Sequence, residues 1–375
     1  MKLTDVVDRI NGNVDRFTTE LKYYIGGEHF ESNELEVTQK GILKENLGKL
    51  GFKFHFAFQD RDVVFMARNP HLRKAGMVRF AGLCSDASYI LRSKDETVLS
   101  QEYLAVMLQS DHFWDYCESH KVGSVNFANN WSSIANYEFE LPTPEEQKEI
   151  SDKVWAAYRL KKSYKKLLAA TEEMVKSQFI EMFGCLAERV ALSSLCDTFI
   201  DGDWIEAKDQ SGSGIRLIQT GNVGVGTFKD KGDRARYISE ETFNRLNCTE
   251  VVEGDILISR LPEPVGRACI IPAGLGKSIT AVDCTIIRLN DKVLPKFFVT
   301  FTNTPDYAMQ IKKVLSGTTR LRVSRANLGK IQVPLPSIDK QQQFVTIAEQ
   351  ADKSGFELRK SIEAIDQVIK SLINN

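Results

Sequence analysis

The sequence lacks the patterns that accompany most disulfide-rich, metal-binding and membrane proteins. Its seven cysteines form no Cys-x-x-Cys pair, so neither a disulfide framework nor a zinc site is expected. Cys117 and His120 come nearest to a metal pair, but they have no second pair and fit a half-buried helix face better. No run of about eighteen apolar residues could form a transmembrane helix. The N-terminus, MKLTDVVDRI, lacks the apolar core of a signal peptide, so we expect a cytoplasmic protein.

Recognisable catalytic motifs are also missing. Gly274–Ser278 ends like a phosphate-binding loop, but Ile271 stands where the motif needs its first glycine. Gly221–Gly226 lacks the spacing of a dinucleotide fingerprint, and a β-turn is expected there. Asp203–Lys208 contains a Glu-x-Lys like that of metal-dependent nucleases, without the further carboxylate on a strand. Asn69-Pro70-His71 is the nearest approach to the element that holds a flipped adenine in amino-methyltransferases. We therefore predict no catalytic residue, metal site or cofactor on this chain.

The net charge is close to zero, but the charged side chains are unevenly distributed. The formal net charge is −1, which taken alone argues against a nucleic-acid binder. Residues 1–141 carry 16 basic and 20 acidic side chains, whereas residues 185–336 carry 20 basic and 17 acidic ones. A local basic face remains compatible with these numbers, because contacts with phosphate act within a Debye length of about 10 Å.

The most regular feature of the sequence is a stretch that occurs twice. The copies begin at Leu141 and Leu335, 194 residues apart, and each continues with proline, a glutamine (Gln147 or Gln341) and a long helical pattern. An internal repeat of this kind indicates two copies of one fold, here with different surface residues. Two different but related targets are therefore expected. The same shift also aligns Gly123-Ser124 with Gly317-Thr318, and Tyr24–Glu28 with Ile218–Asn222.

Each half is expected to be an irregular α/β (α+β) domain built on a sheet. Short apolar segments separated by Gly, Asn, Asp and Pro predict strands at residues 52–58, 63–66, 89–91, 215–219, 255–259, 268–271 and 285–289. Apolar residues at helical spacing predict helices in residues 1–20, 101–117 and 296–315. The predicted segments are a first sheet domain (1–141), a central helical spacer (142–184), a second sheet domain (185–336) and a C-terminal helical spacer (337–375).

The two spacers have the properties of long helices. Pro142 and Pro144 suit the first turn of a helix, and Gly184 is a natural stop after Phe183. About 38 residues with a rise of ~1.5 Å each span roughly 57 Å, which is longer than a compact core requires. The second helix alternates apolar residues by three and four, as in a coiled coil, and the first helix is its candidate partner. The alternative is that each packs on its own domain or on another subunit. The predicted pairing and subunit-docking positions are Ile150, Val154, Tyr164, Leu168, Val175, Phe344, Ile347, Leu358, Ile365 and Leu372.

Polar and basic residues concentrate in two matching loops. The run 317–327 contains Arg320, Arg322 and Arg325 with hydroxyl residues between them, and the run 123–131 has asparagines instead. Arginine reads guanine edges, asparagine and glutamine read adenine, and hydroxyl groups hold phosphates. The loops therefore predict DNA binding with a different base preference in each half. The alternative is that they are solvated loops, because asparagine is frequent in turns.

With these residues in hand, the chain resembles the specificity subunit of type I restriction–modification enzymes. The resemblance rests on the duplicated Leu-Pro-x4-Gln start of a long helix, the Gly-Ser/Thr loop before it, Tyr24–Glu28 with its partner Ile218–Asn222, and Gly254–Arg260. It covers essentially the whole chain. It implies that each sheet domain is a target recognition domain for one half of a split, asymmetric DNA site. It also implies an antiparallel coiled coil that fixes the spacing of the two halves.

The resemblance further implies a hetero-oligomeric complex. Two modification subunits would bring S-adenosylmethionine and adenine methylation, and two restriction subunits would bring ATP, Mg and cleavage, while this chain remains non-catalytic. The DNA-binding residues expected in the first half are Tyr24, Arg68, Arg73, Lys74, Ser124, Asn126, Asn129 and Asn130. Those expected in the second half are Gln219, Thr220, Asn222, Arg260, Arg267, Lys277, Thr318, Thr319, Arg320, Arg322, Ser324 and Arg325.

Two other functions fit the same pattern. One is the specificity subunit of a related methyltransferase–nuclease that has no separate motor subunit. The other is an adaptor with two peptide-binding domains on a coiled-coil strut, which would bind no DNA.

Overall fold

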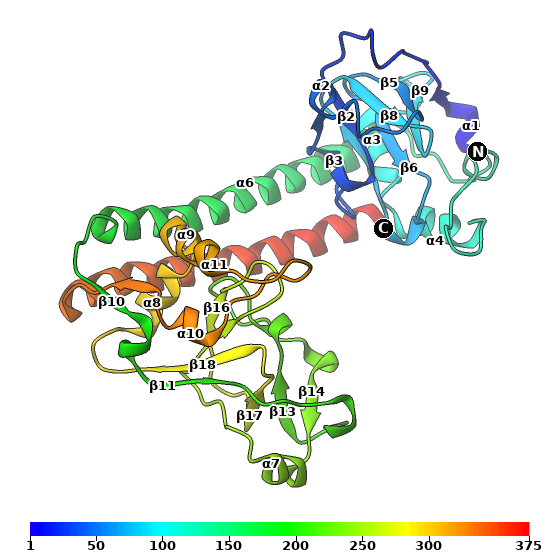
Figure 1. The fold of residues 1–375 in the computed structure, drawn as a ribbon. Coiled ribbons are helices and arrows are strands. Elements are labelled where there is room, and N and C mark those ends of the chain that lie inside the picture. The colour runs from blue at the N-terminus through cyan, green and yellow to red at the C-terminus, as the bar shows by residue number, and fades with distance from the viewer. Residues whose placement is uncertain (375) are drawn as a thin grey trace. The chain divides into compact units, whose positions relative to one another are not determined.

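The two long helices expected from the repeat each contribute to both compact units of the chain. The computed structural model describes residues 1–374. Unit 1 contains Met1–Lys166 and the chain from Arg359 onward, and unit 2 contains Leu167–Leu358. Helix α6 (Pro144–Phe183) and helix α11 (Ile338–Asn374) are therefore shared, and the sheets belong to one unit each (Figure 1). The division into four segments stays a prediction, and the mixed helix-and-sheet fold is confirmed.

Unit 1 contains two sheets. Its strands are β1 (Val7–Ile10), β2 (Tyr23–Ile25), β3 (Glu36–Val37), β4 (Gly41–Ile42), β5 (Phe54–Phe58), β6 (Val63–Met66), β7 (Ala75–Val78), β8 (Gly82–Ser85) and β9 (Ser88–Ser93). Its short helices are α1 (Leu3–Val6), α2 (Leu43–Asn46), α3 (Gln101–Met107), α4 (Asp111–Ser119) and α5 (Trp131–Ala135). The large sheet has the order β1-β9-β6-β7-β3 and the small sheet the order β4-β2-β8-β5. All four side chains of β6 are buried, which explains its uninterrupted apolar sequence.

Unit 2 repeats this plan. Its strands are β10 (Arg189–Ala191), β11 (Cys196–Asp201), β12 (Gln210–Ser211), β13 (Ile215–Ile218), β14 (Arg236–Ile238), β15 (Ile256–Ser259), β16 (Ala268–Ile270), β17 (Ser278–Thr280), β18 (Cys284–Leu289) and β19 (Gln332–Pro334). Its short helices are α7 (Glu240–Leu246), α8 (Pro295–Phe301), α9 (Pro305–Val314) and α10 (Arg325–Leu328). The order β11-β18-β15-β16 corresponds to β1-β9-β6-β7, and the parallel pair β13/β17 corresponds to β2/β8. That pair belongs to a sheet with the order β12-β14-β13-β17, and β10 and β19 form a two-stranded sheet.

A buried carboxylate stands before the central strand of each large sheet. Asp62 precedes β6 and accepts a hydrogen bond from Arg92 Nε at 2.8 Å, and Asp255 precedes β15 and accepts one from Arg288 Nε at 2.8 Å. Both carboxylates are almost fully buried. A buried charge is costly unless it is paired and hydrogen-bonded. These pairs therefore hold the start of the central strand to its neighbour, β9 or β18.

The N-terminal residues differ from their predicted helix. Only Leu3–Val6 are helical, and Val7–Ile10 form the edge strand β1, which pairs with β9. The apolar spacing in this segment fits a helix, but backbone hydrogen bonds with β9 satisfy four residues at once. Residues 11–22 contain no regular helix either. The prediction of one helix over 1–20 is therefore wrong.

The helices predicted at 101–117 and 296–315 are each interrupted. Ser110 caps α4 by accepting a hydrogen bond from Phe113 N, and Thr304 caps α9 by accepting one from Tyr307 N. Pro305 also suits the first turn of α9 and cannot continue α8. The apolar residues keep their helical spacing on both sides of such a break, so the spacing alone predicts one helix. The capping residues determine where the second helix begins.

Helices α6 and α11 pair in opposite directions within each unit. In unit 1, Val154 and Trp155 of α6 share a core with Ile369 and Leu372 near the end of α11. In unit 2, Phe179 near the end of α6 packs edge-on against Phe344 near the start of α11, with ring centroids 5.2 Å apart. The predicted antiparallel pairing is thus confirmed in each unit (Figure 1).

The predicted pairing positions are buried to different degrees. Val154 and Phe344 are buried, while Ile347 is exposed because Phe344, Val345 and Ala348 occupy the packed face of α11. The remaining positions are half-buried, namely Ile150, Tyr164, Leu168, Val175, Leu358, Ile365 and Leu372.

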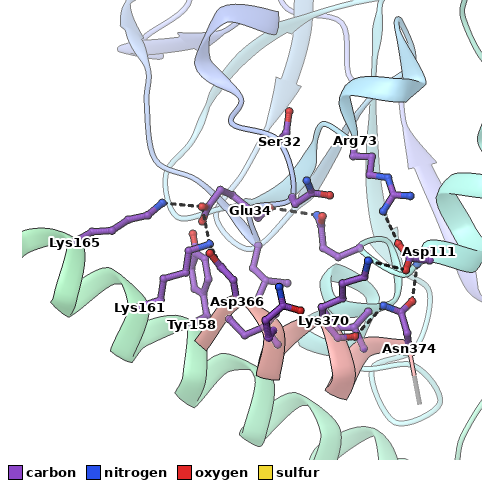
Figure 2. A pocket seen from close by; sticks show the side chains of 16 residues that line it. Ser32, Glu34, Arg73, Asp111, Tyr158, Lys161, Lys165, Asp366, Lys370 and Asn374 are labelled. Carbon is purple, nitrogen blue, oxygen red and sulfur yellow. Dashed lines mark hydrogen bonds and ion pairs between the residues drawn. The ribbon is translucent and has the colours of Figure 1, made fainter. Parts of the chain in front are cut away.

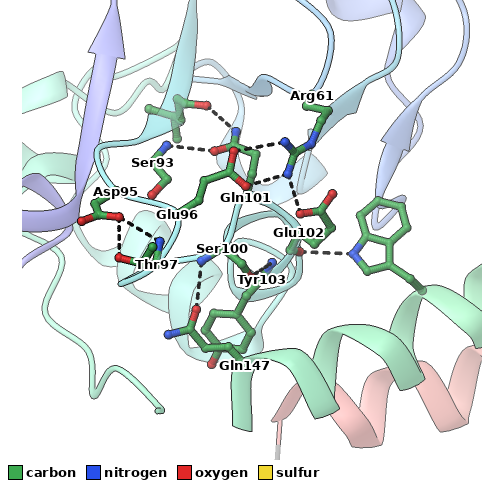
Figure 3. A network of polar contacts seen from close by, with 12 residues as sticks. Arg61, Ser93, Asp95, Glu96, Thr97, Ser100, Gln101, Glu102, Tyr103 and Gln147 are labelled. Carbon is green, nitrogen blue, oxygen red and sulfur yellow. Dashed lines mark hydrogen bonds and ion pairs between the residues drawn. The ribbon is translucent and has the colours of Figure 1, made fainter. Parts of the chain in front are cut away.

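The duplicated glutamine fastens the start of each long helix to its unit. Gln147 is 1% exposed, and its side-chain oxygen accepts from Ser100 N at 3.0 Å (Figure 3). Its amide donates to the carbonyls of Val98 and Pro142 at 2.8 and 2.9 Å. Gln341 does the same with Leu294 N and the carbonyls of Lys292 and Pro336, at 2.9 Å each. A glutamine amide offers one acceptor and two donors, which match these three backbone groups.

We expect Gln341→Ala to lower the free energy of unfolding by about 2–4 kcal/mol, because it leaves one buried N–H and two carbonyls without their partner. Urea unfolding measures the change. Gln342→Ala removes a neighbouring exposed glutamine from the same helix turn and serves as the matched control. Equal stability of the two variants would contradict the role of Gln341.

A buried lysine on α6 joins that helix to two other parts of unit 1. Lys161 Nζ lies 2.9 Å from Glu34 and 2.7 Å from Asp366 of α11, at the side of a cavity of about 400 Å³ (Figure 2). Lys165 Nζ lies 2.9 Å from the same oxygen of Glu34. Burial raises the pKa of Glu34, but the hydrogen bonds and charges of Lys165 and Lys161 outweigh it, so its pKa is lowered overall.

We expect Glu34→Gln to lower the stability by about 1–3 kcal/mol near neutral pH. Since the folded-state pKa is lowered, this stabilisation is present above the ordinary carboxyl pKa and is lost as the pH falls through the folded value. The gap between wild type and variant in urea unfolding should therefore shrink below about pH 4. Glu31→Gln is the control, because Glu31 is half exposed and 3.8 Å from Lys165. A gap that is constant with pH would argue against the ion pair.

Candidate nucleic-acid interface

Two loops with the same backbone geometry follow the equivalent helices of the two units. Loop A (residues 122–128) is closed by mutual hydrogen bonds between Val122 and Ala128, and loop B (residues 316–322) by those between Ser316 and Arg322. The second residue of each is a glycine with positive φ, +106° at Gly123 and +101° at Gly317. A Cβ at either glycine would collide with a carbonyl oxygen across the loop, of Asn126 or of Arg320. Glycine is therefore required at both turns.

Both loops are attached to the far end of the central strand. The residue after loop A, Asn129, donates from its backbone N–H to the Ala67 carbonyl at 2.8 Å, just beyond β6. The residue after loop B, Val323, donates to the Arg260 carbonyl at 3.3 Å, just beyond β15. Arg68, the next residue after Ala67, is exposed and forms a backbone bridge with Ala128. The loops thus occupy equivalent places at the same end of the two large sheets.

Loop A presents small polar and apolar groups. Ser124, Val125 and Asn126 are exposed, Val125 to 84%. Asn130 is exposed at the start of α5. Asn129 points inward instead, since its side-chain amide donates to the Cys117 carbonyl at 2.7 Å. Of the three asparagines predicted to read bases, Asn129 is therefore buried, and its amide N–H group is bonded within the protein.

Loop B presents cations. Thr318, Thr319, Arg320 and Arg322 are all exposed, and so is Arg325 in the first turn of α10. Within residues 1–374, the side chains of these three arginines make no hydrogen bond or ion pair. Ser324 is exposed, and its hydroxyl caps α10 by accepting from Asn327 N at 3.2 Å. The three guanidinium groups are thus available to an external ligand.

A cavity of about 300 Å³ lies beside loop B, lined by Arg260, Asp283, Ser316, Arg322 and Ser324 among others. Arg260 is held in place because its guanidinium donates to the Val282 carbonyl at 2.6 Å. Its Nε lies 3.4 Å from Asp201, a distance at which charge attraction acts without a good hydrogen bond. One fixed and one free arginine therefore border the same concave surface.

Other predicted contact residues have structural partners. Arg267 donates to four backbone carbonyls, of Thr220, Val223, Pro262 and Pro264, and burial lowers its pKa. Arg73 forms an ion pair with Asp111 and, through this hydrogen bond, lowers the pKa of that carboxyl. Tyr24 is buried beside Phe54, and Lys74 donates to the Gly27 carbonyl. Asn222 donates to the Lys229 carbonyl, and Lys277 forms an ion pair with Glu240. Gln219 and Thr220 are half-buried beside Asn222.

The sequence motifs that resembled catalytic sites take ordinary structural forms. Thr220–Asn222 form a 3-10 turn, which the Asn222 side-chain oxygen holds by accepting from Gln219 N, and an antiparallel bridge between Val223 and Phe228 closes the tight turn that follows. Glu206 and Lys208 form a surface ion pair. In residues 1–374 no three His, Cys, Asp or Glu side chains are grouped so as to hold a metal ion. No helix in that part of the chain is long and apolar enough to cross a membrane.

Sequence reasoning missed a group of cations near the Thr220 turn. Lys229, Lys231, Arg234 and Arg236 fall within eight residues between β13 and β14, and all are exposed except the half-buried Lys231. A count of charge in short windows, instead of whole halves, would have found them.

Comparisons with known proteins agree with this geometry. Residues 188–367 match the family described as the type I restriction modification DNA specificity domain. The second half of the chain is thus similar to a type I restriction–modification specificity domain. The resemblance to the specificity subunits of these systems, inferred above from sequence, is thus confirmed. No curated protein matches the sequence.

Two solved structures share the fold of the whole chain. One, from work on complex assembly and conformational transition of the type I R-M system, has a TM-score of 0.59 at 14% sequence identity. The match covers 100% of this chain and 95% of the chain in that structure. The other is the S subunit of a type I restriction–modification system from M. genitalium, with a TM-score of 0.55 at 12% identity, covering 100% of this chain and 94% of its own. The matched segment 188–367 thus lies within a fold that these structures share over the full length.

Proposed function

We propose that this chain is the DNA-recognition subunit of a type I restriction–modification complex and reads an asymmetric site in two parts. One observation carries the proposal. Loop A and loop B have the same backbone geometry and the same anchor on a central strand, yet they present different side chains. The same frame holding different reading groups is what a protein needs to recognise two different short sequences.

The exposed side chains suit the edges of bases in the major groove. Arginine donates two parallel hydrogen bonds to guanine O6 and N7, so Arg320 and Arg322 favour a guanine-containing half-site. Asn126 and Asn130 of the first half have the amide geometry that pairs with adenine N6 and N7. The hydroxyls of Ser124, Thr318 and Thr319 suit phosphates.

The chain itself is proposed to be non-catalytic and to act through partner subunits. Two modification subunits would supply S-adenosylmethionine for adenine methylation, and two restriction subunits would supply ATP, Mg and cleavage. Their DNA contacts would compensate for the net charge of −1. The exposed apolar residues Leu160, Leu167, Met174 and Ile347 on the long helices are candidate docking positions.

We also propose that the length of the helix pair sets the number of base pairs between the two half-sites. Helix α6 has 40 residues, which corresponds to about 60 Å. One turn of DNA is about 34 Å long, so a helix of this length suits a spacer between two major-groove readers.

A system without a motor subunit remains a second possibility with the same recognition chain. Cleavage by the reconstituted complex distinguishes the two, because only a motor-driven system requires ATP hydrolysis. Strong binding of a protein ligand without any binding of DNA would instead support an adaptor.

We expect Arg320→Ala and Arg322→Ala to weaken binding to cognate DNA by about 1–3 kcal/mol each where the guanidinium reads a base, with relaxed preference at that position. Methylome sequencing of the host first gives the recognition site, and fluorescence anisotropy with the full chain then measures affinity. Arg159→Ala, which removes an exposed arginine from α6, should leave affinity unchanged. Unaltered affinity in both loop variants would remove loop B from the site.

Lengthening the helix pair by one heptad should change the spacer and leave both half-sites as they are. The insertion is made in both helices, after Tyr164 in α6 and before Ile362 in α11, so that the apolar seam keeps its register. Seven residues add about 10 Å, the length of roughly three base pairs. Methylated sites are mapped in cells that carry the variant. Altered half-sites with an unchanged spacer would refute this role of the helices.

A further inference from the structure

A basic segment of unit 2 is connected to the anchor of loop B through Arg267 and the turn at residues 220–223. This segment, residues 229–236, runs from the connection after β13 to the first residue of β14 and contains Lys229, Lys231, Arg234 and Arg236. We propose that segment 229–236 binds the phosphodiester backbone of double-stranded DNA beside the bases that loop B reads. The inference rests on the proposed function and adds a second, sequence-independent contact to it.

A continuous series of contacts connects the two regions. Loop B is anchored at the Arg260 carbonyl, and the chain then runs through residues 261–266 to Arg267. Arg267 donates to the carbonyls of Pro262 and Pro264 on one side, at 2.7 and 3.0 Å. On the other side it donates to the carbonyls of Thr220 and Val223, at 2.8 and 2.6 Å. The turn at residues 220–223 is therefore fixed to the connection that carries loop B's anchor.

The basic segment is fixed to the same turn. Asn222 and Lys229 exchange two hydrogen bonds, from Lys229 N to the Asn222 carbonyl at 2.7 Å and from the Asn222 amide to the Lys229 carbonyl at 2.9 Å. Asn222 is itself buried and also accepts from Gln219 N. These hydrogen bonds thus fix the backbone of Lys229 to the turn at residues 220–223.

Two glycines of this turn leave room for the lysine side chains. A Cβ at Gly221 would lie 2.6 Å from Lys231 Nζ, and a Cβ at Gly224 would lie 3.0 Å from Lys229 Cε. Both lysines therefore lie close against the backbone of the turn. Gly221 thus leaves room for the Lys231 side chain, whereas a Cβ at Gly224 would also meet the Thr227 carbonyl oxygen, and Gly226 has a positive φ of +74°.

The charges of the segment are mostly uncompensated. Asp230 is committed to an ion pair with Arg216, and that hydrogen bond lowers its pKa. Asp233 remains as one exposed carboxylate. In the described residues 1–374, the side chains of Lys229, Lys231 and Arg234 have no hydrogen bond or ion pair, and Arg236 is bonded only to the neutral Gln210.

This arrangement suits phosphates better than bases. A lysine ammonium is a compact point charge without the planar fork that recognises a base edge, and it binds phosphate without reading sequence. The contact would therefore strengthen binding to every DNA sequence alike, while loop B supplies the preference.

The test compares Lys229→Gln/Lys231→Gln with wild type, using the full chain and two duplexes. One duplex carries the mapped bipartite site and the other has both half-sites scrambled. We expect the affinity of the variant to fall by the same factor on both duplexes, roughly tenfold or more at 0.1 M salt, and the salt slope to fall by about 2. Lys229→Arg/Lys231→Arg should restore binding, because it restores the charge.

Lys292→Gln/Lys340→Gln is the matched control. Both residues are exposed, and Lys292 follows the end of β18, whereas the start of β18 pairs with the end of β15 near loop B. Lys340 lies on α11 beside Gln341, whose amide donates to the Lys292 carbonyl. The control therefore removes the same charge from the side of unit 2 opposite loop B, and its affinity should equal that of wild type.

Three outcomes would overturn the inference while the proposed function stands. One is a Lys229→Gln/Lys231→Gln variant that binds both duplexes as tightly as the control variant does. Another is a loss on the cognate duplex alone. The third is a variant that binds DNA normally but no longer assembles with its modification subunits, which would make the segment a protein contact. A wild-type chain, alone and in complex, that shows no preference between the duplexes would instead overturn the proposed function.

Discussion

The fold of each unit depends on a buried glutamine at the start of a long helix. Gln147 and Gln341 each satisfy one backbone N–H and two carbonyls that would otherwise be buried without partners. A leucine of similar size would leave all three groups unpaired, and a glutamate would bring a buried charge and no second donor. The Leu-Pro-x4-Gln pattern is therefore a structural requirement, and it connects the helix to the segment that leaves the large sheet.

From this connection, a short series of fixed contacts determines where the loops lie. In unit 2, the buried Asp255–Arg288 pair holds the start of β15, and the loop B anchor is at Arg260, just after its end. Four residues of strand, or about 13 Å, separate the two. Unit 1 repeats this with Asp62, β6 and Ala67. One strand thus connects the region around the start of the long helix with the reading loop. The position of the loop is therefore set by a regular element of the sheet.

What the sequence predicted well depends on local pattern. Residues close together in the sequence are enough to predict the repeat, the fully buried strand β6 and the apolar seams of the long helices. The structural roles of Arg267, Arg73 and Lys277 could not be predicted in this way. Their carbonyl and carboxylate partners lie between 3 and 47 residues away along the chain. Residue type alone suggested DNA contact for all three. The helix expected over residues 1–20 failed for a related reason, since pairing with the distant strand β9 decided its structure.

The reading loops combine a fixed backbone with replaceable side chains. Their geometry depends on a glycine with positive φ and on backbone hydrogen bonds, none of which requires a particular side chain between Gly317 and Arg322. Residues such as Thr318, Arg320 and Val125 are exposed and pack against no core. Exposed substitutions of this kind usually change stability by less than about 0.5 kcal/mol. Two copies of one frame can therefore diverge in their reading groups without loss of the fold, which accounts for a duplicated domain whose loops share their glycine and differ in their other exposed residues.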